Sequence, residues 1–217
     1  MQPTMQHTTR IARALAVAVL ALTAGTASAQ QMKNEPGRMN QAQMQKMMSG
    51  WPQASKEAVM FMMNKYGPPA AMTSDMAAWG KTGPWKRTVV FAREYPHEFP
   101  MHHTDVMQQW IDYKAPPEMY DDLAMYDGSV VLERTSGEMS ARCDKEGANF
   151  LALNLAHEIA TGKRTVEDAR KMYGEQIMAM KAKQPAPYTE RLMFSPMSNT
   201  NDADRALAPG MTGSARP

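Results

Sequence analysis

The segment NFLALNLAHEIA, residues 149–160, constrains the fold more than any other part of the chain. Read as a helix, it is apolar on most of its circumference, and such a helix is stable only where other elements cover it on several sides. Asp144 is suited to start this helix and Gly162 to end it. We therefore expect a central buried helix around which the rest of the domain packs.

A second helix is expected directly after the first. Thr165, with Asp168 three residues later, has the spacing of a capping box, in which two side chains satisfy the first free amides of a helix. Apolar residues then recur at helical spacing and form one stripe. That stripe consists of Ala169, Met172, Tyr173, Ile177 and Met180. The pattern indicates a helix that buries one face and exposes the other.

The segments SVVLERT and EMSARC, separated by a Ser-Gly pair, predict a β-hairpin over residues 129–143. Pairing outward from a two-residue turn makes one face mostly apolar and the other mostly polar, as a half-buried sheet requires. A slip by one residue would destroy this agreement. The pairs expected on the apolar face are Leu132–Ala141 and Val130–Cys143.

Two earlier elements follow from local patterns. Apolar residues from Val59 to Tyr66 recur at helical spacing, and Gly67 followed by two prolines ends that helix. The segment KRTVVFARE, residues 86–94, is rich in β-branched side chains and predicts a strand. A helix and a strand thus precede the hairpin.

Between that strand and the hairpin, Thr104 or Asp105 is suited to cap a further helix. The face of this expected helix is formed by Val106, Trp110 and Tyr113. A short helix is expected after Pro117, and Asp-Gly at 127–128 predicts a turn. The fold class is therefore α+β, with a small antiparallel sheet covered by helices on one face.

The N-terminus has the pattern of an export signal. Arg10 and Arg13 precede the apolar run ALAVAVLALTAG, which is followed by the small residues Ala27 and Ala29. A membrane-spanning helix needs about 20 apolar residues, and this run is too short. We therefore expect residues 1–29 to be a signal peptide cleaved near Ala29, and the protein to be periplasmic or secreted without a membrane span.

Composition divides the rest of the chain into three parts. Residues 30–50 are polar and methionine-rich, which indicates a flexible segment. Residues 51–183 contain all four tryptophans and are expected to form a single globular domain. Residues 184–217 are rich in proline and small polar residues, which is typical of a disordered tail.

Charge and cysteine content exclude some classes of protein. Loss of residues 1–29 removes two arginines and no acidic residue from the 24 basic and 22 acidic residues, leaving 22 of each. A net charge near zero argues against a nucleic-acid-binding protein, which needs a basic surplus. The single cysteine, Cys143, cannot form an internal disulfide, so stability must come from an apolar core.

Four segments resemble a family of uncharacterised exported bacterial proteins: GPWKRTVVFAREYPHEFP, HHTDV, YDGSVVLERTSGEMSARCDKE and NFLALNLA. The resemblance covers roughly Trp51 to Met180. It implies an exported domain and carries no catalytic or ligand-binding residues.

The stretch EYPHEFPMHHTD, residues 94–105, is the first candidate site. Imidazoles suit zinc or copper, and a neighbouring carboxylate can complete the ligand set. The candidate metal ligands are His97, His102, His103 and Asp105. Their spacing matches no established zinc motif, so the sequence favours a hydrogen-bonded structural or surface loop, with a metal site as the alternative. We therefore expect no cofactor, with zinc or copper as the alternative.

Methionine suggests a second way to hold copper. Met44, Met47 and Met48 would share one helix face, and thioethers are soft ligands for Cu(I). Methionine also fills irregular gaps in apolar cores, and that interpretation covers most of the chain's methionines equally well.

Cys143 raises the possibility of a cysteine-dependent enzyme. It lies where a strand leads into the start of a helix, a place that favours the thiolate. His157 is about 20 Å further along the same helix and cannot serve as its base, so a histidine of the 97–103 stretch would have to approach through tertiary folding. The expected hairpin places this thiol on the apolar face, where a cysteine is inert.

No sequence motif of an enzyme is present: the chain has no glycine-rich phosphate loop, no nucleophile elbow and no His-Glu-x-x-His. We assign no catalytic residue. The sequence favours an exported binding or structural module over an enzyme, with a transition-metal-binding protein as the alternative and a Cys143-dependent enzyme as the third hypothesis.

Overall fold

The computed structural model describes residues 41–205, which fall into two compact units with their boundary between Lys46 and Met47. The described part of the first unit belongs to helix α2 (Gln41–Met47). The predicted signal peptide and the last residues, 206–217, lie outside the described part of the chain. All elements discussed below belong to the second unit.

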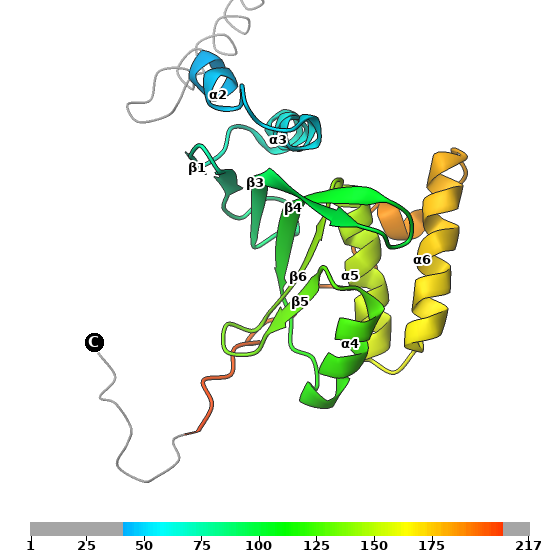
Figure 1. Cartoon of the computed structure of the whole chain (residues 1–217). Coiled ribbons are helices and arrows are strands. Elements are labelled where there is room, and N and C mark those ends of the chain that lie inside the picture. Colours follow the sequence, from blue (N-terminus) through cyan, green and yellow to red (C-terminus); the bar gives the residue numbers. More distant parts are fainter. Residues whose placement is uncertain (1–40, 206–217) are drawn as a thin grey trace, which may run out of the picture. The chain divides into compact units, whose positions relative to one another are not determined.

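Between residues 47 and 205, antiparallel pairing joins the strands into one six-stranded sheet (Figure 1). The order in space is β1-β2-β3-β4-β6-β5, so β4 lies in the interior of the sheet between β3 and β6. This confirms the predicted α+β class with an antiparallel sheet. The strands are β1 (Ala71–Met72), β2 (Met76–Trp79), β3 (Arg87–His97), β4 (His103–Asp112), β5 (Val130–Glu133) and β6 (Glu138–Cys143).

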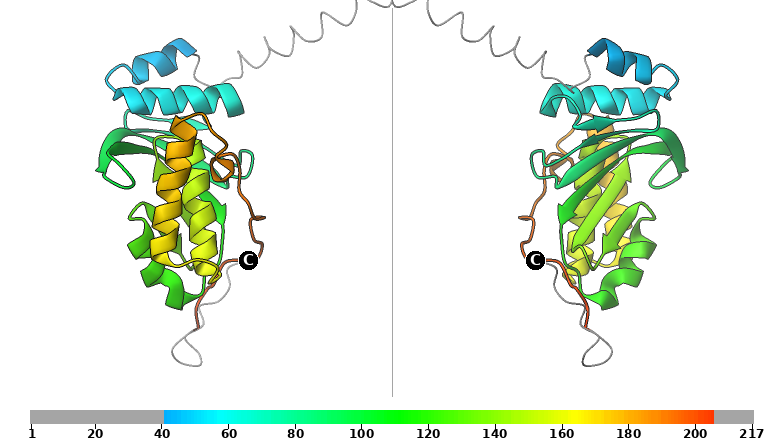
Figure 2. Two further views of the ribbon diagram at one scale, coloured as in Figure 1. Left: turned by 90° about the vertical axis from the view of Figure 1, so that its right-hand side faces the viewer. Right: turned by 90° about the vertical axis from the view of Figure 1, so that its left-hand side faces the viewer.

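Helices α5 (Glu146–Ala160) and α6 (Val166–Lys181) lie side by side against one face of the sheet, as the two views of Figure 2 show. Side chains on nearly every side of α5 are buried, which confirms the predicted central helix. Thr165 Oγ1 accepts a hydrogen bond from the backbone N–H of Asp168 at 3.1 Å, so the predicted start of α6 is confirmed as well.

Two apolar clusters fill the interior. The larger one surrounds α5 and includes helix α4 (Tyr120–Tyr126), which follows a short 3₁₀ turn at Pro117–Met119. In the smaller cluster, α3 (Gln53–Tyr66) packs Val59 against Val90 and other residues of β3 and β4. The helices predicted before Gly67 and after Pro117 are thus confirmed.

The helix expected after Thr104 or Asp105 is wrong, because these residues lie in strand β4. Every second residue of β4 from 105 to 111 has a buried side chain, and these four side chains share one face of the sheet. These positions are Asp105, Met107, Gln109 and Ile111. Two of the four are polar, which conceals the period-two pattern of a strand. Pairing with β3 on one side and β6 on the other then overrides the local helical spacing.

The hairpin of β5 and β6 forms where predicted, but its pairing differs by two residues. Val130 lies opposite Ala141, and Leu132 opposite Met139. The turn has four residues and includes Gly137, whose φ of +62° favours glycine. Because a shift of two keeps each side chain on its face, the apolar face is preserved. Cys143 pairs with Met107 of β4 instead of Val130.

The domain boundary predicted at residue 183 needs correction, because residues 184–205 pack along the domain. We call them the strap. Asn154 Nδ2 donates to the carbonyls of Tyr188 and Arg191, and Phe194 stacks on His157 with ring centroids 4.1 Å apart. Backbone groups of the strap thus find partners on α5, which explains how a proline-rich segment whose regular structure is one 3₁₀ turn at Pro187–Thr189 stays attached.

A buried carboxylate ties α3 to the start of α5. Glu146, 4% exposed, accepts hydrogen bonds from Trp85 Nε1 and from the Tyr66 hydroxyl, both at 2.7 Å. It also forms an ion pair with Lys65. Burial and the neighbouring Glu146 raise the pKa of Tyr66 well above its usual value, so the hydroxyl stays protonated and donates.

A second carboxylate provides a pH-dependent contribution to stability. Glu138 is held by Arg87 through two hydrogen bonds of 2.9 and 2.5 Å. Arg87, followed by Lys86, lowers the pKa of Glu138, so the stabilisation is complete above the unfolded pKa of about 4.3 and is lost as pH falls through the folded pKa.

We expect Glu138→Gln to destabilise the domain by about 1–2 kcal/mol at pH 7, since Arg87 is 39% exposed and solvent screens the pair. The difference from wild type should shrink as urea unfolding is repeated at successively lower pH from about 5 to about 3. A difference that stays constant over this range would show that the charge of Glu138 contributes nothing.

Candidate metal centre

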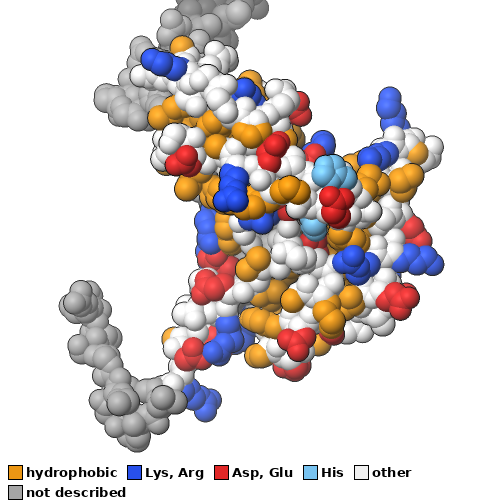
Figure 3. Space-filling model, in the orientation of Figure 1, with side chains coloured by type: hydrophobic (Ala, Val, Ile, Leu, Met, Phe, Trp, Pro, Cys, Tyr) orange, Lys and Arg blue, Asp and Glu red, His pale blue; other side chains and the backbone are white. Residues whose placement is uncertain are grey.

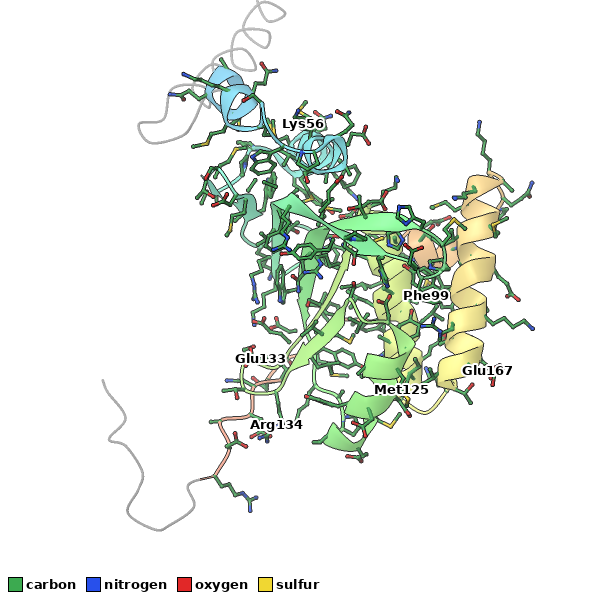
Figure 4. All side chains as sticks on the ribbon, in the orientation of Figure 1. Lys56, Phe99, Met125, Glu133, Arg134 and Glu167 are labelled. Carbon is green, nitrogen blue, oxygen red and sulfur yellow. The ribbon has the colours of Figure 1, made fainter. Side chains whose placement is uncertain are left out.

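The predicted histidine stretch forms the end of the β3–β4 hairpin, which we call the arm (residues 95–105). Beyond Val90 the pairing of β3 with β4 shifts register, and it resumes at Tyr95 opposite Asp105. Figure 1 shows the arm reaching toward α6. Its connecting loop is anchored by Phe99, which packs against Tyr173 with ring centroids 4.9 Å apart and points between the arm and the helices (Figure 4).

Three of the four predicted ligands converge at this arm. His97 and His103 are directly opposite each other across the two strands, and Asp105 follows two residues along β4 on the same face. One nitrogen of each imidazole and one carboxylate oxygen all lie within 4.8 Å of one another. His97 Nδ1 is 3.3 Å from Asp105 Oδ2, and His103 Nε2 is 3.2 Å from Asp105 Oδ1.

These short distances are not well-formed hydrogen bonds. His97 Nδ1, His103 Nε2 and Asp105 Oδ1 are buried and have no hydrogen-bond partner of acceptable geometry among the described residues. Zinc binds nitrogen and oxygen at about 2.0–2.1 Å, and neighbouring ligand atoms of a tetrahedral site are then about 3.3 Å apart. The distance from His103 Nε2 to Asp105 Oδ1 matches that separation, whereas His97 Nδ1 is near the other carboxylate oxygen, Oδ2. One ion could therefore be shared by the three residues, whose ligand atoms lie within 4.8 Å of one another.

Further groups hold the ligands in orientation. His103 Nδ1 lies 2.9 Å from the Met101 carbonyl, which can accept the Nδ1 proton and leave the Nε2 lone pair directed at Asp105. His97 Nε2 lies 3.7 Å from Asp127 Oδ1. The Ser129 hydroxyl donates to Asp105 Oδ2. The Met101 carbonyl is thus placed as the second shell of a metal-binding histidine usually is, whereas the 3.7 Å between His97 and Asp127 is too long for a hydrogen bond.

The two buried carboxylates of the cluster, Asp105 and Asp127, attract positive charge. Asp105 is 1% exposed and Asp127 4%, and burial raises the pKa of Asp127. The Asp105 carboxylate, with a smaller effect from Cys143, raises the pKa of His103 to about 11. A metal ion would therefore compete with a proton for His103 Nε2. Arg142 Nε, 3.9 Å from Asp105 Oδ2, already supplies part of the positive charge that balances these carboxylates.

His102 does not join the cluster, so this part of the predicted ligand set is corrected. Its side chain is 76% exposed and pairs with Glu98 at 2.8 Å. His102 lies in the bend before β4, which begins at His103, so the two neighbouring side chains are not held on the same strand. Figure 3 shows histidine side chains on this face beside an acidic side chain.

Sequence reasoning missed Asp127 and Ser129 as parts of the site. They belong to the turn between α4 and β5, where the backbone N–H of Ser129 donates to Asp127 Oδ1 at 2.8 Å. The Asp-Gly pair indicated that turn, but no local signal shows which distant strand the turn will face.

Cys143 lies beside this cluster and is buried. Burial raises the pKa of its thiol, and the nearby His103 opposes that effect. Both residues line a cavity of about 240 Å³ against Tyr173 and Met180 of α6. In a thiol enzyme one imidazole nitrogen faces the sulfur and the other an orienting group. His103 interacts with Met101, Asp105 and the Cys143 sulfur. Because burial outweighs the effect of His103 and keeps the pKa of the thiol raised, the reactive thiolate of this pair is disfavoured.

The methionines of the expected copper-binding face differ in burial. Met48 is 4% exposed and packs in the smaller cluster with Trp51, whereas Met47 is 39% exposed. A buried thioether that fills a core gap is the ordinary use of methionine.

No protein-family model matches the chain, and neither a curated protein nor a solved structure shows significant similarity to it. The resemblance of the four sequence segments therefore brings no residue roles to the site. Among residues 41–205, none of the helices combines the length and the apolar character needed to cross a bilayer. The conclusions on function rest on the chemistry of the arm and its neighbours.

Proposed function

We propose that the protein binds a divalent transition-metal ion, Zn²⁺ first among them, through His97, His103 and Asp105. The observation that carries the proposal is that one ligand atom from each of the three residues lies within 4.8 Å of the others. Each residue also has a buried polar atom without a hydrogen-bond partner among the described residues. The N-terminal pattern supports placing this binding function in the periplasm or outside the cell.

The donor set supports zinc, copper or nickel over harder ions. Two imidazole nitrogens are borderline ligands that Mg²⁺ and Ca²⁺ seldom use, because these ions prefer oxygen throughout. Among the borderline ions, Zn²⁺ accepts a tetrahedral arrangement with ligand separations like those at Asp105. The second shell of Met101, Asp127 and Ser129 would hold that arrangement before the ion arrives.

The test is calorimetric titration of metal-stripped protein with Zn²⁺. We expect binding in the micromolar range or tighter by wild type, and a loss of at least about 100-fold in His103→Ala and Asp105→Asn, because each removes a ligand. His102→Ala is the matched control: it removes the adjacent, exposed imidazole and should leave the affinity unchanged.

Thermal unfolding without metal shows whether each variant is folded. Asp105→Asn keeps the size of the side chain, so a folded Asp105→Asn that binds Zn²⁺ like wild type would contradict the proposal. Absence of binding by folded wild type would do so as well, and the cluster would then be an ion-pair network that fastens the arm to the turn at Asp127.

A further inference from the structure

Cys143 occupies a defined position relative to the proposed ligands. It is the last residue of β6 and lies opposite Met107 of β4, two residues beyond Asp105 on the same face of that strand. Diagonal neighbours on adjacent strands are about 7–8 Å apart at Cα, within the combined reach of two side chains around one ion. The thiol and His103 also line one cavity.

The polar atoms around this thiol are incompletely satisfied. Asp105, 1% exposed, has one oxygen without a hydrogen-bond partner among the described residues, and His103 Nε2 likewise has none there. Sγ of Cys143 makes a weak contact of 3.5 Å with Asp144 Oδ1. A tetrahedral ion held by His97, His103 and Asp105 needs a fourth ligand. Sγ of Cys143 lies outside the group of ligand atoms within 4.8 Å of one another, so it would have to move toward the ion on binding.

We propose that Cys143 is the fourth ligand of the metal ion and that the cavity of about 240 Å³ beside it is the ion's route of entry. This inference rests on the proposed function. On binding, the S–H bond breaks, a sulfur–metal bond forms, and the proton leaves to solvent through the cavity; no electron is transferred. The ion's positive charge compensates the cost of placing a thiolate in a buried site.

A complete four-ligand set changes what the site would do. Zinc sites with four protein ligands hold the ion, whereas sites with three keep a position open for water or substrate. A His₂AspCys set is also softer than His₂Asp and would favour Zn²⁺, Co²⁺ and copper further over Mg²⁺. The site would thus serve to sequester or deliver a metal ion, not to hydrolyse a substrate.

Cobalt substitution tests the inference, because Co²⁺ reports its ligands by absorption. We expect full-length wild type loaded with Co²⁺ to show the visible bands of a tetrahedral ion and a sulfur-to-cobalt charge-transfer band in the near ultraviolet. Cys143→Ser should keep the visible bands, lose the charge-transfer band and bind Zn²⁺ about 10–100-fold more weakly. His102→Ala should match wild type in every respect.

Thiol labelling gives an independent readout. Zn²⁺ should slow alkylation of Cys143 by iodoacetamide in wild type and not in Asp105→Asn. Visible bands without a charge-transfer band, together with unchanged labelling, would overturn the role of Cys143 and leave the proposed function intact. No visible bands in folded wild type would overturn both.

Discussion

Replacing Glu146 by alanine is expected to destabilise the domain by about 3–5 kcal/mol, which would leave little of the stability typical of a single domain. The change leaves two buried donors, Trp85 Nε1 and the Tyr66 hydroxyl, without their acceptor, and it removes the partner of Lys65. An unsatisfied buried donor costs about 1–3 kcal/mol, and a small cavity adds to that. Urea unfolding followed by tryptophan fluorescence measures the loss.

Glu146→Gln separates the hydrogen bonds from the charge. Glutamine keeps one acceptor oxygen for Trp85 or Tyr66 and loses the ion pair, so we expect about half the effect of alanine. Lys65, which is 45% exposed, contributes little, and Lys65→Met should cost less than about 1 kcal/mol. A loss below about 1 kcal/mol in Glu146→Ala would mean that water or a local shift replaces the carboxylate.

Gly137→Ala is expected to detach the strap from the β5–β6 turn and to destabilise the domain by about 2–4 kcal/mol. A β-carbon at this position would overlap the backbone of Thr200 and Asn201. The positive φ of +62° adds about 1–2 kcal/mol of strain for any other residue. Hydrogen exchange should report the detachment at the amides of Met197 and Asp202, which bond to Asp112 and Arg134.

Gly162→Ala is the matched control for this prediction. Gly162 also has a positive φ, of +70°, but a β-carbon added there would meet no described atom within 4 Å, so alanine at this position introduces strain alone. We expect a loss of about 1–2 kcal/mol and unchanged exchange in the strap. Equal losses in both variants, without faster exchange at Met197, would contradict the packing of the strap.

The elements that could be predicted from the sequence are those whose burial follows a simple apolar pattern. The stripe from Ala169 to Met180 and the nearly all-apolar α5 needed no knowledge of their neighbours, because hydrophobic spacing alone specifies them. β4 could not be recognised in this way, since Asp105 and Gln109 occupy its buried face. Gln109 is satisfied by tertiary contacts, among them a hydrogen bond of 3.0 Å from Asn149.

The candidate site was predictable to the extent that its ligands are neighbours in sequence. His97, His103 and Asp105 belong to one hairpin, and their residue types alone suggest a metal. The exposure of His102 follows from its place in the bend before β4, and the sequence did not reveal where that strand begins. Asp127 and Cys143 join from other elements, and only the strand order β4-β6-β5 brings them to the arm.

The two outer strands of the sheet have a consequence for behaviour at high concentration. β1 has two residues and β5 has four, ending in Glu133, so these two strands expose few unpaired backbone groups. A foreign chain that paired with β5 would gain few hydrogen bonds and would meet a carboxylate. The two outer strands are therefore poor templates for the edge-to-edge growth that leads to fibrils.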